Sequence, residues 1–160
     1  MKTKFLGKTN NKSEKKGKNL LDNIPRTKED IKYGFDIWNG YDFMHLDKNM
    51  IPHLSVLEIT IPSNSDFIIE SKSMKLYLNH FYNKSFETRS EILKIVKKDI
   101  EHKINSKIKV KFIKSFSKEP TVININKLKL KSSPNKKVLK FNGFRSICPV
   151  TSQPDFASIY

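Results

Sequence analysis

The chain has 160 residues, which suits one domain, or one domain with part of a second. It carries 31 lysine and arginine residues against 16 aspartate and glutamate residues, and the formal net charge of +15 is typical of proteins that bind a nucleic acid or another anionic surface. The single cysteine excludes an internal disulfide, and no apolar run reaches the roughly 20 residues of a membrane helix, so we expect a cytoplasmic protein that does not enter a membrane.

The beginning of the chain differs in composition from the rest. Residues 1–18 contain seven lysines, one glutamate and few hydrophobic residues, so we predict a disordered basic tail. A turn region around Pro25 and Gly34 follows. The stretch FDIWNGYDF, residues 35–43, then places four aromatic side chains in nine positions. We interpret it as an element that is buried against a sheet.

The next segment has the pattern of a strand. Residues 53–62 alternate apolar and polar side chains, as a strand with one buried face does. Its apolar positions are Leu54, Val56 or Leu57, Ile59 and Ile61. The polar run SNSD predicts a turn at residues 63–66, and the following stretch is first strand-like and then begins a helix near Met74.

The clearest helix covers residues 88–104. Thr88 and Glu91 form a T-x-x-E capping box, which is a start signal for a helix. Apolar residues then recur at four-residue spacing, which keeps them on one helix face. These residues are Ile92, Val96, Ile100 and Ile104.

The last third of the chain is predicted to be mostly extended. Residues 107–116 alternate apolar residues with lysines, which fits a strand with one wet face. Residues 121–131 alternate too, but their phase slips at Asn126 and Lys127, which indicates a bulge or a tight turn. An extended pattern resumes at 138–150. The whole chain therefore predicts an α+β fold, an antiparallel sheet with helices packed on one face.

The C-terminal run RSICPVTSQPDFASIY contains the first candidate site. A lone cysteine is usually a small buried hydrophobic residue, and Asp155, which follows Pro154, has an ordinary use in a turn or at a helix N-cap. The prolines and polar residues between Cys148 and Asp155 instead favour a shaped loop. In such a loop Arg145 can stabilise the thiolate of a nucleophilic Cys148, and burial can raise the pKa of Asp155 so that it acts as a general acid.

The run ESKS, residues 70–73, is the second candidate site. A carboxylate, two hydroxyls and an ammonium group are also ordinary at the solvent-exposed end of a strand, where they need have no function. The functional interpretation needs a ligand whose N–H groups bind the Glu70 carboxylate and whose phosphate or ribose binds Ser71 and Lys72.

Other common sites lack support in the sequence. The four histidines, at positions 45, 53, 80 and 102, are far apart and have no metal-ligand spacing. HExxH, CxxC, P-loop and GxGxxG motifs do not occur, so neither a zinc site nor a Rossmann nicotinamide site is indicated.

Taken together, the two candidate sites resemble those of one family, the NADPH-dependent 7-cyano-7-deazaguanine reductases of queuosine biosynthesis (the QueF nitrile reductases). CPVTSQPDFASIY is similar to the family's Cys-Pro-x-Thr-x-Gln-Pro-Asp-Phe active-site run, and ESKSMKLYLNHF is similar to its Glu-Ser-Lys-Ser segment. ESKS precedes the cysteine run here, as in the long form of the family, which has two tandem tunnelling-fold (T-fold) units. GFDIWNGYDFMHLDKNMIPHLSVLEI also resembles the first unit of that form. The resemblance runs from about residue 20 to the end and is weakest over residues 107–140.

The resemblance implies a reaction and the residues that carry it out. Cys148 would attack the nitrile carbon of 7-cyano-7-deazaguanine to form a thioimide, and Asp155 would donate the proton. Two hydrides from NADPH would then give the aminomethyl product, which is used in tRNA modification. The implied substrate-binding residues are Ile69, Glu70 and Ser71. The implied NADPH-binding residues are Ser71 and Lys72.

The resemblance also implies an organisation of the chain. Residues 19–135 would form the first T-fold unit, and residues 136–160 would begin the second. The family's Phe-His-Glu and Arg-Gly-Gly segments are not found after Asp155, so we expect the second unit to be incomplete. The resemblance further implies a homo-oligomer that makes no direct contact with nucleic acid.

Two other interpretations remain open from the sequence. In the first, the chain is an inactive truncated remnant of such a reductase. In the second, it is a basic RNA-binding module, as its charge suggests. The lysines are spread along the whole chain, which a bias in genomic base composition also explains.

Overall fold

The computed structural model describes residues 17–26, 33–116, 121–124, 138–147 and 152–160. The chain divides into two compact units, Met1–Ser115 and Phe116–Tyr160, and each is described by itself. Within the described ranges, no helix has both the length and the apolar character that crossing a membrane requires.

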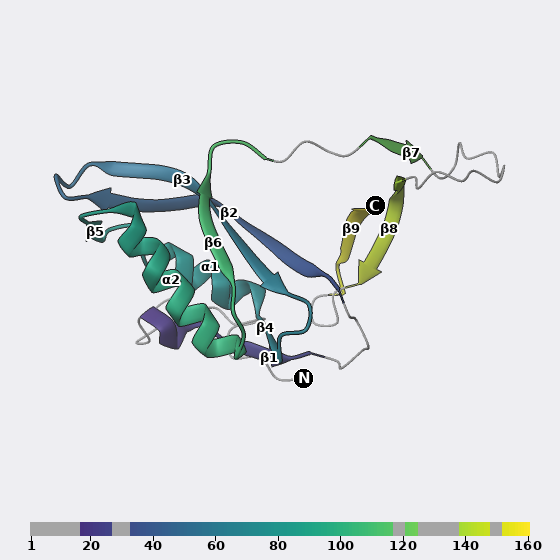
Figure 1. Cartoon of the computed structure of the whole chain (residues 1–160), viewed down its shortest axis with the longest axis horizontal. Helices are drawn as coiled ribbons and strands as arrows, with labels where there is room; N and C mark the ends of the chain where they lie inside the picture. The colour runs from purple at the N-terminus through teal and green to yellow at the C-terminus, as the bar shows by residue number, and fades with distance from the viewer. Residues whose placement is uncertain (1–16, 27–32, 117–120, 125–137, 148–151) are drawn as a thin grey trace. The chain divides into compact units, whose positions relative to one another are not determined.

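The first unit combines two sheets with two helices. Its elements in chain order are η1 (a 3-10 turn, Gly17–Leu20), β1 (Asn23–Pro25), β2 (Phe35–Asp47), β3 (Pro52–Pro62), β4 (Phe67–Ile69), α1 (Ser71–Asn79), β5 (Ser85–Phe86), α2 (Arg89–Ile104) and β6 (Lys109–Ile113). The larger sheet has the order β5–β2–β3–β6, antiparallel except that β5 runs parallel to β2. Strands β1 and β4 form a separate antiparallel pair. Both helices cover the same face of the larger sheet (Figure 1), so the predicted α+β layout is confirmed.

The second unit is a small sheet of mostly exposed residues. It consists of β7 (Val122–Asn124), β8 (Val138–Ile147) and β9 (Pro154–Ile159), in the order β7–β8–β9. Strand β7 is parallel to β8, and β9 is antiparallel to it. The extended pattern predicted from residue 138 is therefore confirmed as far as residue 147. The predicted phase slip at Asn126 and Lys127 and most of the predicted basic tail lie outside the described residues.

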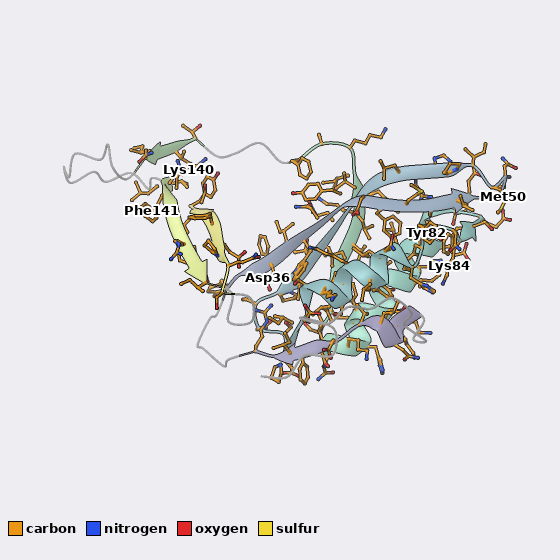
Figure 2. The ribbon with its side chains drawn as sticks, turned by 180° about the vertical axis from the view of Figure 1, so that it is seen from behind. Asp36, Met50, Tyr82, Lys84, Lys140 and Phe141 are labelled. Carbon is orange, nitrogen blue, oxygen red and sulfur yellow. The ribbon has the colours of Figure 1, made fainter. Side chains whose placement is uncertain are left out.

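A tight turn joins β2 to β3 and sets their register. One carboxylate oxygen of Asp47, Oδ1, accepts hydrogen bonds from the backbone N–H groups of Asn49 at 2.8 Å and Ile51 at 3.0 Å. The Ile51 bond is the largest influence that holds the pKa of Asp47 below its ordinary value, followed by His53. Met50, at the tip of the hairpin (Figure 2), has a positive φ of 63°. This turn places the side chains of the two strand ends opposite each other.

Helix α2 supplies much of the core of the first unit. Its N-cap is Thr88, whose Oγ1 accepts a hydrogen bond from the N–H of Glu91 at 3.2 Å, as the capping box predicts. The Glu91 carboxylate accepts a further hydrogen bond, from the N–H of Glu87 at 3.3 Å, one residue before the cap. All four apolar residues predicted for one helix face are fully buried. They are Ile92, Val96, Ile100 and Ile104.

The structure corrects two predictions about the strands. The aromatic-rich segment is itself strand β2, not an element packed on a sheet: Phe43 is buried, but Phe35 and Tyr41 are 64% and 65% exposed. In β3, Leu57 is buried whereas Leu54 is 66% exposed. Successive side chains of a strand point to opposite faces, so Leu54 cannot share the core face with Leu57. In both cases a residue's hydrophobicity did not reveal which face it occupies.

Candidate functional site

The ESKS segment lies where β4 ends and α1 begins. Ile69 is buried and pairs with Asn23 of β1. Glu70 is the N-cap of α1, and both of its carboxylate oxygens accept hydrogen bonds from the helix. Oε1 binds the N–H of Lys72 and Oε2 binds the N–H of Ser73, each at 2.8 Å. Glu70 is only 2% exposed, so its carboxylate holds the first turn of the helix in a place that water scarcely reaches.

A buried serine ties this helix start to the N-terminal part of the unit. Ser73 Oγ donates a hydrogen bond to the carbonyl oxygen of Glu70 at 2.7 Å and accepts one from the N–H of Asp22 at 3.0 Å. The N–H of Glu70 in turn donates to the carbonyl oxygen of Asp22 at 2.8 Å. Sequence reasoning did not assign roles to Asp22 and Ser73. The only signal in the sequence that could have pointed to this contact is the second serine of ESKS, Ser73.

Ser71 and Lys72 occupy the first turn of α1. Ser71 is exposed and Lys72 is half-buried. A helix N-terminus favours negative charge, and a hydroxyl and an ammonium group beside it are suitable donors for a phosphate. The N–H groups of Lys72 and Ser73 are already bound by the Glu70 carboxylate, so a phosphate at this helix start would depend on the side chains of Ser71 and Lys72.

Helix α1 is also fastened at its other end. The hydroxyl of Tyr77 donates a hydrogen bond to Asp99 Oδ2 of α2 at 2.9 Å. Burial, and then the charge of Asp99, raises the pKa of Tyr77 well above its ordinary value, so the phenol keeps its proton and remains a donor. This hydrogen bond joins α1 to α2 and so helps to fix the helix that begins at the ESKS segment.

The C-terminal candidate site is described only in part. Cys148 lies outside the described residues. Asp155 is the second residue of β9, opposite Ser146 of β8, and it is exposed. It therefore lies in a strand and not in a helix cap. The burial that the sequence interpretation requires of Asp155 is not provided by the residues that the structure describes.

A second polar cluster, which sequence reasoning did not anticipate, lies at the hairpin end of β2 and β3. The register places His45 opposite His53, with their rings stacked and 5.6 Å apart. His53 Nε2 is 3.1 Å from Asp47 Oδ2, but the Nδ1 atom of the buried His45 has no hydrogen-bond partner among the described residues. Burial, then the nearby His53 and Arg89, lowers the pKa of His45.

This histidine cluster does not amount to a metal centre. In the described part of the chain, no three side chains of ligating type are placed so that they could hold a metal ion. His45 is best described as a neutral residue of the core, adjoining an open space of about 100 Å³.

Comparisons with known proteins agree on one family. A family model described as "Nitrile reductase, 7-cyano-7-deazaguanine-reductase N-term" matches residues 13–112. The NADPH-dependent 7-cyano-7-deazaguanine reductase of Acinetobacter baylyi is 32% identical over an alignment of 152 residues that covers 82% of this chain and 56% of the relative. Proteins of the same name from Coxiella burnetii and Rickettsia bellii are each 31% identical over 146 residues, covering 79% of this chain and 52% and 54% of the relatives. The chain thus spans about half the length of the curated relatives it matches.

Proposed function

The chain belongs to the nitrile reductase family whose model describes the N-terminal part of 7-cyano-7-deazaguanine reductase, and on this premise we propose that it serves the NADPH-dependent reduction of 7-cyano-7-deazaguanine. The product is the aminomethyl compound, an intermediate of queuosine biosynthesis and hence of tRNA modification. The match over residues 13–112 is the observation that carries the proposal.

Cys148 and Asp155 are the proposed catalytic residues. The Cys148 sulfur adds to the nitrile carbon, which is a soft electrophile suited to a thiolate, and the nitrile nitrogen takes a proton from Asp155. One bond forms between sulfur and carbon, and one π bond of the nitrile is lost, which gives a covalent thioimide. After the first hydride reached this carbon, the carbon–sulfur bond would break again, which would free Cys148 and leave an imine for the second reduction.

The start of α1 is the proposed binding segment. Ile69, Glu70 and Ser71 contact the substrate, and Ser71 and Lys72 hold a phosphate of NADPH. The exposed Ser71 hydroxyl and the Lys72 ammonium at a helix N-terminus support this assignment. NADPH supplies the hydrides. Glu70 accepts three hydrogen bonds, from the N–H groups of Lys72 and Ser73 and from the Ser71 hydroxyl, which leaves about one of its roughly four acceptor positions for an N–H group of a guanine-like edge.

We further propose that residues 19–135 belong to a T-fold and that residues 136–160 begin a second one, although the compact units of the structure divide earlier, after Ser115. Among the residues that the structure describes, helices cover one face of the larger sheet (Figure 1), and the other face exposes Phe35, Ile37 and Leu54. Exposed apolar residues on one face of a sheet are typical of a surface that another unit or subunit covers. They support the proposed homo-oligomer.

The decisive experiment is to look for the thioimide on Cys148. The chain contains one cysteine, so a covalent adduct has a single thiol to form on. The protein is incubated with 7-cyano-7-deazaguanine without NADPH, and intact mass and peptide mapping are measured. We expect a mass increase equal to the whole nitrile, located on the peptide that contains Cys148.

Two controls make the result interpretable. The reductase of Acinetobacter baylyi, treated in the same way, shows that the conditions support adduct formation. Cys148→Ser should abolish the adduct, and Asp155→Asn should slow its formation because the nitrile nitrogen loses its proton donor. If the relative reacts and this chain does not, the proposed chemistry is wrong for this chain.

A further inference from the structure

The solvent side of α2 carries a group of lysines that the reductase chemistry does not use. They line an open recess of about 470 Å³, called here the α2 lysine recess. Its lining residues are Lys94, Lys97, Lys98, Glu101, His102 and Lys107. Four lysines against one carboxylate make this a strongly basic surface, even though lysines are spread evenly along the sequence.

The helix arranges these side chains in a regular row. Lys94, Lys98 and His102 follow each other at four-residue spacing, so their positions rise by about 6 Å at each step along one side of α2. The only carboxylate of the recess is already engaged. Glu101 Oε2 is 3.3 Å from Lys107 Nζ, and its Oε1 accepts a hydrogen bond from the N–H of Ile108 at 3.1 Å. Within the described residues, neither Lys94 nor Lys98 forms an ion pair, so both ammonium groups can pair with the negative charges of a ligand.

The composition of the surface limits what it can bind. The apolar face of α2 is fully buried in the core, and residues 89–107 include no large exposed hydrophobic side chain. The helix therefore has no apolar face to place in a membrane. The recess contains no arginine, phenylalanine, tyrosine or tryptophan, and its only planar side chain is His102. It therefore has little of the equipment that reads bases by paired hydrogen bonds or by stacking.

We propose that the α2 lysine recess binds the phosphate backbone of a nucleic acid, without regard to its sequence. A row of lysine point charges suits a ligand with a continuous line of negative charge, and a nucleic-acid duplex carries one charge per roughly 1.7 Å of its axis. This binding is independent of the proposed reductase function.

Salt dependence gives the proposal a quantitative test. The probe is a fluorescently labelled 20-base-pair DNA duplex of arbitrary sequence, bound to the full chain and followed by anisotropy between 50 and 200 mM salt. Lys97 and Lys107 are paired with Glu101, so contacts of Lys94 and Lys98 set the lower limit. They predict a slope of log affinity against log salt of about −1.8 or steeper, which weakens binding by roughly tenfold or more over this range. An RNA duplex of the same length should behave similarly.

Matched variants separate the recess from the overall charge. Lys94→Gln combined with Lys98→Gln should reduce the slope by about 2 and weaken binding by roughly tenfold or more. Lys48→Gln combined with Lys75→Gln removes the same charge from two other exposed positions and should leave the slope nearly unchanged. Lys94→Arg combined with Lys98→Arg should keep the binding, which shows that the first variant acts through charge.

Three results would overturn the proposal. In the first, the two glutamine variants weaken binding equally, so that diffuse charge explains it. In the second, neither duplex binds even at 50 mM salt. In the third, vesicles containing phosphatidylserine bind as tightly as the duplexes and lose as much affinity in the Lys94 and Lys98 variant. An unchanged urea midpoint for each variant confirms that all of them are folded.

Discussion

Replacing Glu70 with alanine would remove the acceptor that holds the first turn of α1. The carboxylate accepts two backbone hydrogen bonds of 2.8 Å, and the residue is 2% exposed. A buried N–H group that loses its partner costs roughly 1–3 kcal/mol. The N–H of Ser73 is buried and that of Lys72 is half-buried, so we expect Glu70→Ala to lower the free energy of unfolding by about 3 kcal/mol.

Thr88→Ala is the matched control, because Thr88 caps the other helix at an exposed position. Its side chain accepts one hydrogen bond, from the N–H of Glu91 at 3.2 Å. Loss of an exposed N-cap typically costs about 1 kcal/mol. The difference between the two variants therefore measures what burial adds to the same kind of bond. Glu70→Gln, which keeps one acceptor oxygen, should fall between them.

Urea unfolding followed by the fluorescence of Trp38 measures these effects. Trp38 is the only tryptophan of the chain, and it packs against the core of the first unit. With a denaturant slope of about 2 kcal/mol/M, the Glu70→Ala midpoint should fall by about 1.5 M and the Thr88→Ala midpoint by about 0.5 M. If Glu70→Ala costs no more than Thr88→Ala, the carboxylate is not the structural cap described here.

Two further predictions concern the core. Because the pKa of His45 lies below its ordinary value of 6.5 in the folded protein, the unfolded chain takes up this proton more readily. Stability should therefore decrease as pH falls below about 6.5, and His45→Phe should flatten the profile of urea midpoint against pH in that range. An equally steep profile in the variant would assign the pH dependence to other groups. Ile100→Ala, at a fully buried position, should lower the free energy of unfolding by about 3 kcal/mol. Leu54→Ala, at a position 66% exposed, should lower it by no more than about 0.5 kcal/mol. Equal losses in urea unfolding would contradict the assigned faces.

Helix α2 could be predicted from the sequence almost to the residue. The capping pair Thr88 and Glu91 and the four-residue spacing of its apolar positions are local signals. They determine where a helix begins and which of its sides is apolar, whatever the rest of the chain does. The predicted bounds, 88–104, differ from the observed helix only by the cap residue.

The faces of the strands could not be assigned in the same way. β2 contains apolar residues on both faces, and a bulge between Gly40 and Phe43 changes its register with β3. Gly40 lies against α1, where an added Cβ would come within 3.0 Å of Leu78 Cδ1. The burial of Phe43 and the exposure of Phe35 therefore follow from the pairing of strands and the position of a helix, which alternation alone does not encode.

The sequence by itself determined the residue types of the candidate sites and the family resemblance. Only the tertiary structure decided what several of these residues do. Ser73 meets Asp22 across 51 positions of the chain, and His45 meets His53 through the register of a hairpin. The lysines of α2 form one recess because packing of the apolar face leaves them together on the solvent side. Local spacing encodes the faces of one element, whereas contacts between elements depend on how those faces pack.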